Sequence, residues 1–148
     1  LLVIVGDGPD RKKYELQIKR YGLWKNIILE RWRNDLPSMY RSFDLFLQPS
    51  WYEGWGRTVI EAMASGLPVI ITDVGLAGEV VKNGENGIVA PVGDMHAIQK
   101  AVKELYQNCS LRACLAQEGR KTAQSLVPST KEEYMKKYKN ALTQCMNA

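Results

Sequence analysis

The spacing of hydrophobic residues changes along the chain, and the change divides it into two parts. In the first ninety residues, short apolar runs alternate with stretches of helical spacing, whereas after Asp94 apolar residues recur only at helical spacing. The runs predict strands at Leu1–Val5, Asn26–Leu29, Leu45–Gln48, Val69–Ile71 and Gly87–Val89. The chain therefore predicts alternating strands and helices followed by a purely helical end.

Helix start and stop signals lie between these strands. Pro9 suits the first turn of a helix that reaches Tyr21, with Gly22 as the residue that ends it. A capping box, Ser129-x-x-Glu132, predicts the start of a last helix that runs to about Cys145. The other predicted helices are Asp35–Ser42, Arg57–Ser65 closed by Gly66, one capped by Asp94 with an apolar face reaching Leu105, and Ser110–Gln124.

The predicted strands are apolar on both faces, which is typical of a parallel sheet covered by helices on each side. We therefore predict an α/β fold, a Rossmann-like parallel sheet with helices on both faces and further helices at the C-terminus. Ligands of such sheets bind beyond the C-terminal ends of the strands. The loops expected together on that rim are Gly6–Pro9, Glu30–Asn34, Pro49–Thr58 and Thr72–Gly78.

Charge is spread unevenly over the 148 residues, although the net value is only +4. Residues 10–33 carry eight basic and three acidic groups, while residues 34–119 carry six basic and ten acidic groups. An acidic middle does not favour nucleic acid as a partner. The basic ends are solvated helix faces, or surfaces that meet anionic lipid or a protein partner.

Composition also bounds the chemistry. Three cysteines and a single histidine, His96, predict neither a disulfide framework nor a zinc site of the usual type, and they favour a reducing compartment. No Asp-x-Asp pair is present to hold a metal-bound diphosphate. The segment Gly6-Asp7-Gly8-Pro9 opens like a dinucleotide fingerprint, but Arg11 replaces its third glycine, so a plain tight turn is favoured.

Residues 49–64 hold the main candidate chemistry. Glu53 lies in the loop that leaves a predicted strand, and Glu61 lies in the helix that follows. Gly54 and Gly56 allow a ligand close approach to the backbone. The amides of Gly56, Arg57 and Thr58 would be unpaired donors at the helix start, a ready site for phosphate oxygens.

Two interpretations of Glu61 stay open on these grounds. Its carboxylate, set among apolar neighbours, suits the paired hydroxyls of a ribose, or it complements the helix dipole. Arg57 is either a phosphate contact or a solvent-facing residue, and Trp55 is predicted to pack rather than to stack on a sugar.

The chain resembles the C-terminal domain of the group 1 family of GT-B glycosyltransferases over nearly its whole length. The matching blocks, in order, are Ile4-Val5-Gly6-Asp7-Gly8-Pro9, Phe43–Ser50, Glu53-Gly54-Trp55-Gly56, Glu61-Ala62-Met63-Ala64, Gly66–Ile70, Asp73-Val74-Gly75, Glu79-Val80-Val81, Asn83–Gly87 and Gly93-Asp94. This ordered set is far more specific than the glutamate pair alone. Arg31 stands where the family has glycine, which affects the contacts expected for a base.

The resemblance implies a role for each matched residue. Glu53 is expected to face the donor sugar as the catalytic residue, and Glu61 to bind the ribose. The amides of Gly54, Trp55 and Gly56 are expected to hold sugar hydroxyls. The remaining nucleotide contacts implied are Thr58 and Val59 at the diphosphate and Trp32, Arg33 and Leu36 at the base. Arg57 stands where the family commonly has an apolar residue, so its phosphate contact is an addition to the family's pattern.

The function implied is that of half an enzyme. Residues 1–148 are expected to be the nucleotide-sugar-binding domain, truncated at its N-terminal edge, of a retaining, metal-independent hexosyltransferase. A separate N-terminal domain, absent here, is expected to bind the saccharide or glycolipid acceptor. No cofactor is implied besides the nucleoside-diphosphate sugar. The resemblance implies a cytoplasmic protein, with peripheral contact at the inner face of the membrane as an open alternative.

Two other functions remain alternatives. One is a GT-B-like nucleotide-sugar epimerase, which needs acid–base residues not evident here. The other is a non-catalytic module that binds a nucleotide or sugar. The 148-residue chain by itself is expected to fold and to transfer no sugar.

Overall fold

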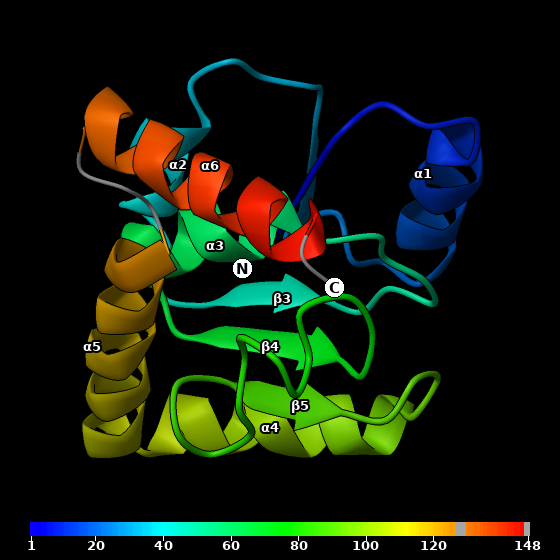
Figure 1. The fold of residues 1–148 in the computed structure, drawn as a ribbon. Helices are drawn as coiled ribbons and strands as arrows, with labels where there is room; N and C mark the ends of the chain where they lie inside the picture. The colour runs from blue at the N-terminus through cyan, green and yellow to red at the C-terminus, as the bar shows by residue number, and fades with distance from the viewer. Residues whose placement is uncertain (127–129, 147–148) are drawn as a thin grey trace. The chain divides into compact units, whose positions relative to one another are not determined.

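The computed structural model describes residues 1–126 and 130–146. They form two compact units, Leu1–Leu36 and Pro37–Ala148, which we call unit 1 and unit 2. Figure 1 shows their elements in chain order. Every residue in the described part that is buried lies at Tyr40 or beyond it, so the hydrophobic core belongs to unit 2.

Unit 1 consists of β1 (Leu2–Val5), α1 (Arg11–Arg20) and β2 (Ile27–Glu30). The two strands pair in parallel, with Leu2 opposite Ile27. Arg11 ties the start of the helix to the strand ends, because its guanidinium donates to the carbonyl oxygens of Leu29 at 2.9 Å and Glu30 at 3.2 Å. This face of α1 is therefore turned toward the sheet.

The turn before α1 differs from the predicted helix start. α1 begins at Arg11, and Pro9 and Asp10 form a turn closed by the Arg11 amide, which donates to the Gly8 carbonyl at 3.1 Å. The prediction of a plain tight turn is confirmed, and the placement of Pro9 inside the helix is wrong. Gly22 ends the helix as predicted, with a left-handed φ of +66° that favours glycine.

Unit 2 holds a three-stranded parallel sheet in the order β3-β4-β5, with β4 buried along its whole length. Its elements are α2 (Leu36–Tyr40, entering from the last residue of unit 1), β3 (Phe46–Gln48), α3 (Arg57–Ala64), β4 (Val69–Thr72), β5 (Ile88–Ala90), α4 (Met95–Gln107), α5 (Cys109–Leu126) and α6 (Lys131–Met146). Ile70 of β4 packs with Ala101, Leu105 and Leu115 of α4 and α5. Figure 1 shows α4 and α5 beside the sheet of β3, β4 and β5. The carboxyl end of β4 is therefore anchored by the core.

The α/β class with parallel strands is as predicted, and the strands pair in two groups. β1 pairs only with β2, and β3, β4 and β5 pair with one another. α2 has five residues instead of the eight predicted, and Pro37 is its second residue. Asp94 caps α4 as predicted, because its side chain accepts from the Ala97 amide at 2.9 Å.

The start of α6 only partly falls within the described residues. Ser129, the first residue of the predicted capping box, lies outside them. Thr130 performs a cap from the next position, because its hydroxyl accepts from the Glu133 amide at 3.1 Å. The prediction of a helix starting here is confirmed through Thr130.

Several surface features bear on the predictions made from composition. No helix in residues 1–126 or 130–146 is long and apolar enough to cross a membrane. The three cysteines are free thiols on exposed positions of α5 and α6. His96 is exposed on α4.

Candidate functional site

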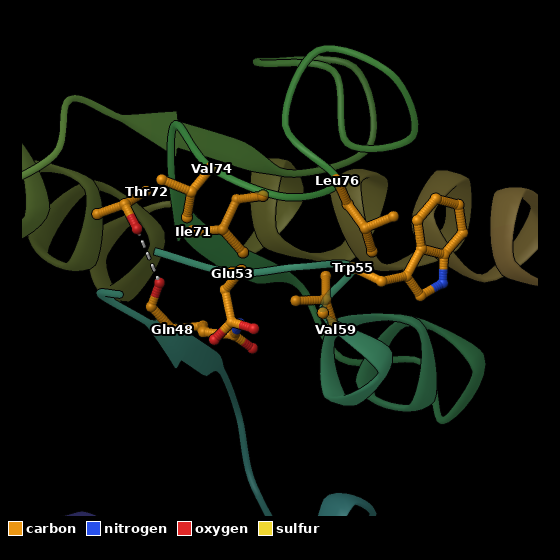
Figure 2. A pocket seen from close by; sticks show the side chains of 9 residues that line it. Gln48, Glu53, Trp55, Val59, Ile71, Thr72, Val74 and Leu76 are labelled. Carbon is orange, nitrogen blue, oxygen red and sulfur yellow. Dashed lines mark hydrogen bonds between the residues drawn. The ribbon is translucent and has the colours of Figure 1, made fainter. Parts of the chain in front are cut away.

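Two of the four predicted rim loops meet in unit 2. The loop after β3 and the loop after β4 are joined by Thr72, whose buried hydroxyl donates to the Ser50 carbonyl at 2.6 Å. The same hydroxyl lies 3.4 Å from the Gln48 carbonyl, the contact drawn as a dashed line in Figure 2. Because Thr72 is the last residue of β4, the core fixes the loop that carries Glu53.

Glu53 is held from two sides within this loop pair. The Ser50 hydroxyl donates to its Oε1 at 2.8 Å. Gly75 lies against its stem, since a Cβ on Gly75 would come within 2.9 Å of the Glu53 Cβ. Gly75 also has a left-handed φ of +58°, so only glycine suits the position on both counts.

A small pocket opens beside Glu53 in Figure 2. Trp55 is one of its walls and is 48% exposed. It is therefore not the packing residue that was predicted, and its indole is available to a ligand. The residues that line the pocket are Gln48, Glu53, Trp55, Gly56, Val59, Ile71, Thr72, Val74 and Leu76.

Free backbone donors follow Glu53 directly. Gly56 precedes α3 with a φ of +88°, a left-handed turn that ends the loop and starts the helix. The amides from Gly54 through Thr58 donate to no other group in the described ranges. They are thus available to an anion beside the pocket, as the sequence predicted.

Val59 differs from its neighbours. Its amide donates to the Gly56 carbonyl at 3.0 Å and its side chain is buried. Val59 therefore has no free amide for the predicted contact with a diphosphate. Its side chain forms an apolar wall of the pocket.

Glu61 is half-exposed on α3, one to two helical turns after these amides. The hydroxyl of buried Tyr40 donates to its Oε2 at 3.3 Å. Burial, the charge of Glu61 and this hydrogen bond together raise the pKa of Tyr40 to about 12. Tyr40 therefore stays protonated at neutral pH and orients one oxygen of the Glu61 carboxylate.

Arg57 contacts the other oxygen of that carboxylate. Its guanidinium lies 3.9 Å from Glu61 Oε1, and its side chain is 86% exposed. The solvent-facing interpretation of Arg57 thus describes the structure, although so exposed a cation remains free to meet a phosphate. A pair this exposed contributes little to stability.

Gln48 was missed by the sequence analysis. It ends the short strand β3, where its Oε1 accepts from the Thr58 hydroxyl at 2.8 Å, and its side chain lines the pocket. The signal that would have found it is a polar residue that closes an otherwise apolar run, Phe46-Leu47-Gln48, immediately before the candidate loop.

The other two rim loops meet in unit 1. The Trp32 amide donates to Asp7 Oδ2 at 3.0 Å, which joins the loop after β2 to the loop after β1. The Trp32 indole is exposed. The residues predicted to contact a base therefore belong to a different compact unit from Glu53 and Glu61.

Arg33 has its polar edge occupied. It forms two hydrogen bonds with the Asp35 carboxylate, at 2.7 and 2.6 Å, which raise the pKa of Arg33 and lower the pKa of Asp35. The planar face of the guanidinium remains for stacking against a base. Leu36, the third base-side residue, is half-buried at the first position of α2.

These features define a class of protein first. A parallel α/β unit whose strand-end loops present a fixed carboxylate beside free helix-start amides is a Rossmann-like ligand-binding domain. The family follows from a direct match: residues 1–122 fit the family model described as glycosyl transferases group 1. The chain therefore belongs to the group 1 glycosyltransferase family.

Curated relatives agree with the family. One is the UDP-Gal:alpha-D-GlcNAc-diphosphoundecaprenol alpha-1,3-galactosyltransferase of Escherichia coli, 34% identical over 104 residues. The match covers 69% of this chain and 27% of that enzyme. The chain spans only between 25% and 36% of the full length of the first curated relatives that it matches.

Solved structures agree with the fold. The C-terminal domain of a group 1 glycosyltransferase, LpcC from Francisella tularensis, is 31% identical, with a TM-score of 0.75. That likeness covers 83% of this chain and 67% of the solved LpcC domain. HepE from Anabaena, solved in complex with UDP, has a TM-score of 0.78 at 27% identity, covering 83% of this chain and 35% of HepE. Both likenesses support the assignment to one half of a GT-B fold, while the roles of single residues stay predictions.

Proposed function

We propose that this chain is the donor-binding half of a retaining glycosyltransferase that moves a hexosyl group from a nucleoside diphosphate to a saccharide or lipid-linked acceptor. The observation that carries the proposal is the segment from Glu53 to Thr58. There a carboxylate fixed by Ser50 and Gly75 is followed at once by unpaired helix-start amides. A sugar diphosphate needs both kinds of group, side by side.

The amides suit the diphosphate. Helix-start N–H groups point at an anion, and the helix dipole favours negative charge there. In the transfer reaction the diphosphate leaves with growing negative charge, so donors already in place stabilise the transition state more than the bound substrate. Arg57, which is exposed beside them, adds a positive charge near the same position.

Glu53 suits the sugar. Its carboxylate lines the pocket that also holds Gln48 and the Trp55 indole, a mixture of polar and aromatic surface typical of saccharide sites. A fixed carboxylate holds sugar hydroxyls and stabilises the positive charge that develops on the ring as the bond to the diphosphate breaks. Glu53 therefore acts as a positioning and electrostatic group rather than as a nucleophile.

Glu61 suits the ribose. Tyr40 and Arg57 each contact one oxygen of its carboxylate, which leaves lone pairs free for two neighbouring hydroxyls. This arrangement favours the ribose over the helix-dipole interpretation, because a dipole partner needs no such orientation. Its test is calorimetry with the bare nucleotide, described at the end of the Discussion.

The acceptor belongs to the part of the enzyme outside this chain. A relative names a diphosphoundecaprenol-linked acceptor, and another is a capsular polysaccharide glycosyltransferase of Staphylococcus aureus. We extend the same acceptor class, saccharide or lipid-linked saccharide, to this chain. The 148 residues alone should bind nucleotide weakly and transfer no sugar, because alignment of both reactants supplies up to about 7–11 kcal/mol of such a barrier.

The proposal is tested with full-length protein and a panel of uridine, guanosine and adenosine diphosphate sugars. Glu53→Gln should lower turnover on the accepted donor about 100-fold or more and leave affinity for the bare nucleotide unchanged, because Glu53 contacts only the sugar. Nuclear magnetic resonance of the product reads the anomeric configuration, which should be retained.

Glu104→Gln is the matched control, since Glu104 is an exposed carboxylate on α4, away from both loops. It should leave turnover unchanged. Release of an isomerised nucleotide sugar without transfer would identify an epimerase instead. Binding without turnover on any donor and acceptor would leave only a binding module.

A further inference from the structure

One face of α1 is basic and unpaired. Along this helix four basic residues and Leu16 recur at intervals of three and four residues, which places them on one side of the cylinder, while exposed Tyr14, Glu15 and Gln17 lie around the rest of it. The group, which we call the basic face, consists of Lys12, Lys13, Leu16, Lys19 and Arg20. Arg11, by contrast, turns inward to the strand ends, so the basic face is on the opposite side of α1.

Within the described residues the lysines of the basic face form no ion pair, and the Arg20 guanidinium lies 5.8 Å above the Tyr21 ring. Among the residues of unit 1, all of which the structure describes, the ion pairs of α1 are made by Arg11, with Asp7 and with Glu15. Lys12, Lys13 and Lys19 take part in no ion pair and are exposed. No aspartate or glutamate interrupts the face, which leaves a concentrated positive charge in contact with solvent.

Apolar side chains are set among and beside these charges. Leu16 lies at the centre of the basic face and is 69% exposed. Beyond the C-terminal end of α1, Tyr21 and Trp24 are 66% and 65% exposed, and Lys25 lies 4.8 Å above the Trp24 ring. Exposed tryptophan and leucine beside lysine and arginine are typical of surfaces that enter a lipid headgroup layer.

We propose that the basic face of α1, with Trp24 at its end, docks the enzyme on the surface of an anionic membrane. Charge complementarity selects the occupant: phosphate headgroups match the lysines, and the acyl boundary accepts Leu16 and Trp24. An acidic protein matches the lysines but gives no general reason for an exposed leucine at their centre. The docking does not depend on the sugar-transfer assignment, although a lipid-linked acceptor gives it a purpose.

The docking is peripheral and reversible. A few apolar side chains bury too little surface to anchor a protein irreversibly, so electrostatic attraction carries most of the affinity. Each lysine or arginine near an anionic surface strengthens binding about fivefold, and salt weakens it over the Debye length.

The test is flotation of full-length protein with two kinds of vesicle, phosphatidylcholine alone and phosphatidylcholine mixed with phosphatidylglycerol. Wild-type protein should bind only the mixed vesicles, and about 1 M salt should release most of it. The triple variant Lys12→Gln, Lys13→Gln, Lys19→Gln should lose on the order of 100-fold in partition coefficient. The arginine triple at the same positions should bind like wild type.

A matched control separates the site from net charge. Lys131→Gln, Lys136→Gln, Lys139→Gln on α6 removes three charges from exposed positions of another helix. It should lose less than about threefold. Circular dichroism of each variant checks that the fold is intact.

The contrary results are distinct. Equal binding of wild type to both vesicles overturns the assignment to anionic headgroups, and binding to neither overturns the membrane assignment and leaves an acidic macromolecule as the partner. Equal loss in the α1 and α6 triples overturns the assignment to this face. Trp24→Ser should remove the binding that persists at high salt, and unchanged residual binding contradicts the apolar part of the proposal.

Discussion

The two units build their strand-end loops in the same way but support them differently. In unit 1 the loops meet through one exposed hydrogen bond, from the Trp32 amide to Asp7, and no side chain is buried beneath them. In unit 2 they meet through buried Thr72 and through the close approach of Gly75 to Glu53. The comparison teaches that the loop that carries Glu53 is preorganised by a core, and the loop that carries Trp32 is not.

This difference matches what each side must do. Stabilising charge in a transition state requires groups that are fixed before the substrate arrives, because reorganisation consumes the gain. Under the proposed function, contact of a flat base with the exposed Trp32 indole or the Arg33 guanidinium tolerates ordering on binding.

The largest expected effect separates the two units by stability. Ile70→Ala in β4 removes a side chain that is fully buried among α4 and α5, and it should cost about 3–4 kcal/mol. Ile28→Ala in β2 removes one that is 40% exposed and should cost less than about 1.5 kcal/mol. Urea unfolding with hydrogen exchange at β2 and β4 measures both, and equal costs would remove the contrast between the units.

A second prediction tests preorganisation at Glu53. Gly75→Ala combines a left-handed backbone with a Cβ that meets Glu53, whereas Gly78→Ala has a similar φ of +77° and open space around it. Both should cost about 1–3 kcal/mol of stability. Only Gly75→Ala should also lower sugar transfer strongly, measured per folded molecule. Equal loss of transfer in the two variants would show that Gly75 acts through stability alone.

A smaller effect concerns Tyr40 and pH. The folded pKa of Tyr40, about 12, lies above its ordinary value of 10.0. A raised pKa means that the folded state keeps this proton longer, so its stabilising contribution is complete below pH 10 and is lost as pH rises through about 12. Ultraviolet titration should show a last tyrosine ionising in that range, and Tyr40→Phe should remove it.

Local sequence signals predicted local structure well. Gly22 and Gly66 end α1 and α3 with left-handed φ values, and Asp94 caps α4, because each device acts within a few residues. The unpaired amides before Thr58 follow from the same logic: the first turn of any helix lacks internal acceptors. Glu53 and Glu61 were identified as candidates because they lie on either side of these amides and because both match the family's pattern.

Contacts between segments far apart in the chain were not predictable. Thr72 with Ser50 and Gly75 with Glu53 depend on the register of β3 against β4, which hydrophobic spacing does not fix to one residue. Gln48 was passed over because a single polar residue at a strand end carries no periodic signal. The pairing of the strands in two groups was not predicted, because a run of apolar residues predicts a strand without naming its neighbour.

The central claim is that two glutamates of one segment have different roles. Glu61 holds the nucleoside, and Glu53 holds the transferred sugar. Calorimetry of the bare nucleoside diphosphate with full-length protein and its two variants tests it most directly. Glu61→Ala should weaken binding by about 1.5–3 kcal/mol, because a charged hydrogen-bonding partner is lost, and Glu53→Gln should leave it unchanged. Unchanged affinity in a folded Glu61→Ala variant, or weakened affinity in Glu53→Gln, would contradict the division.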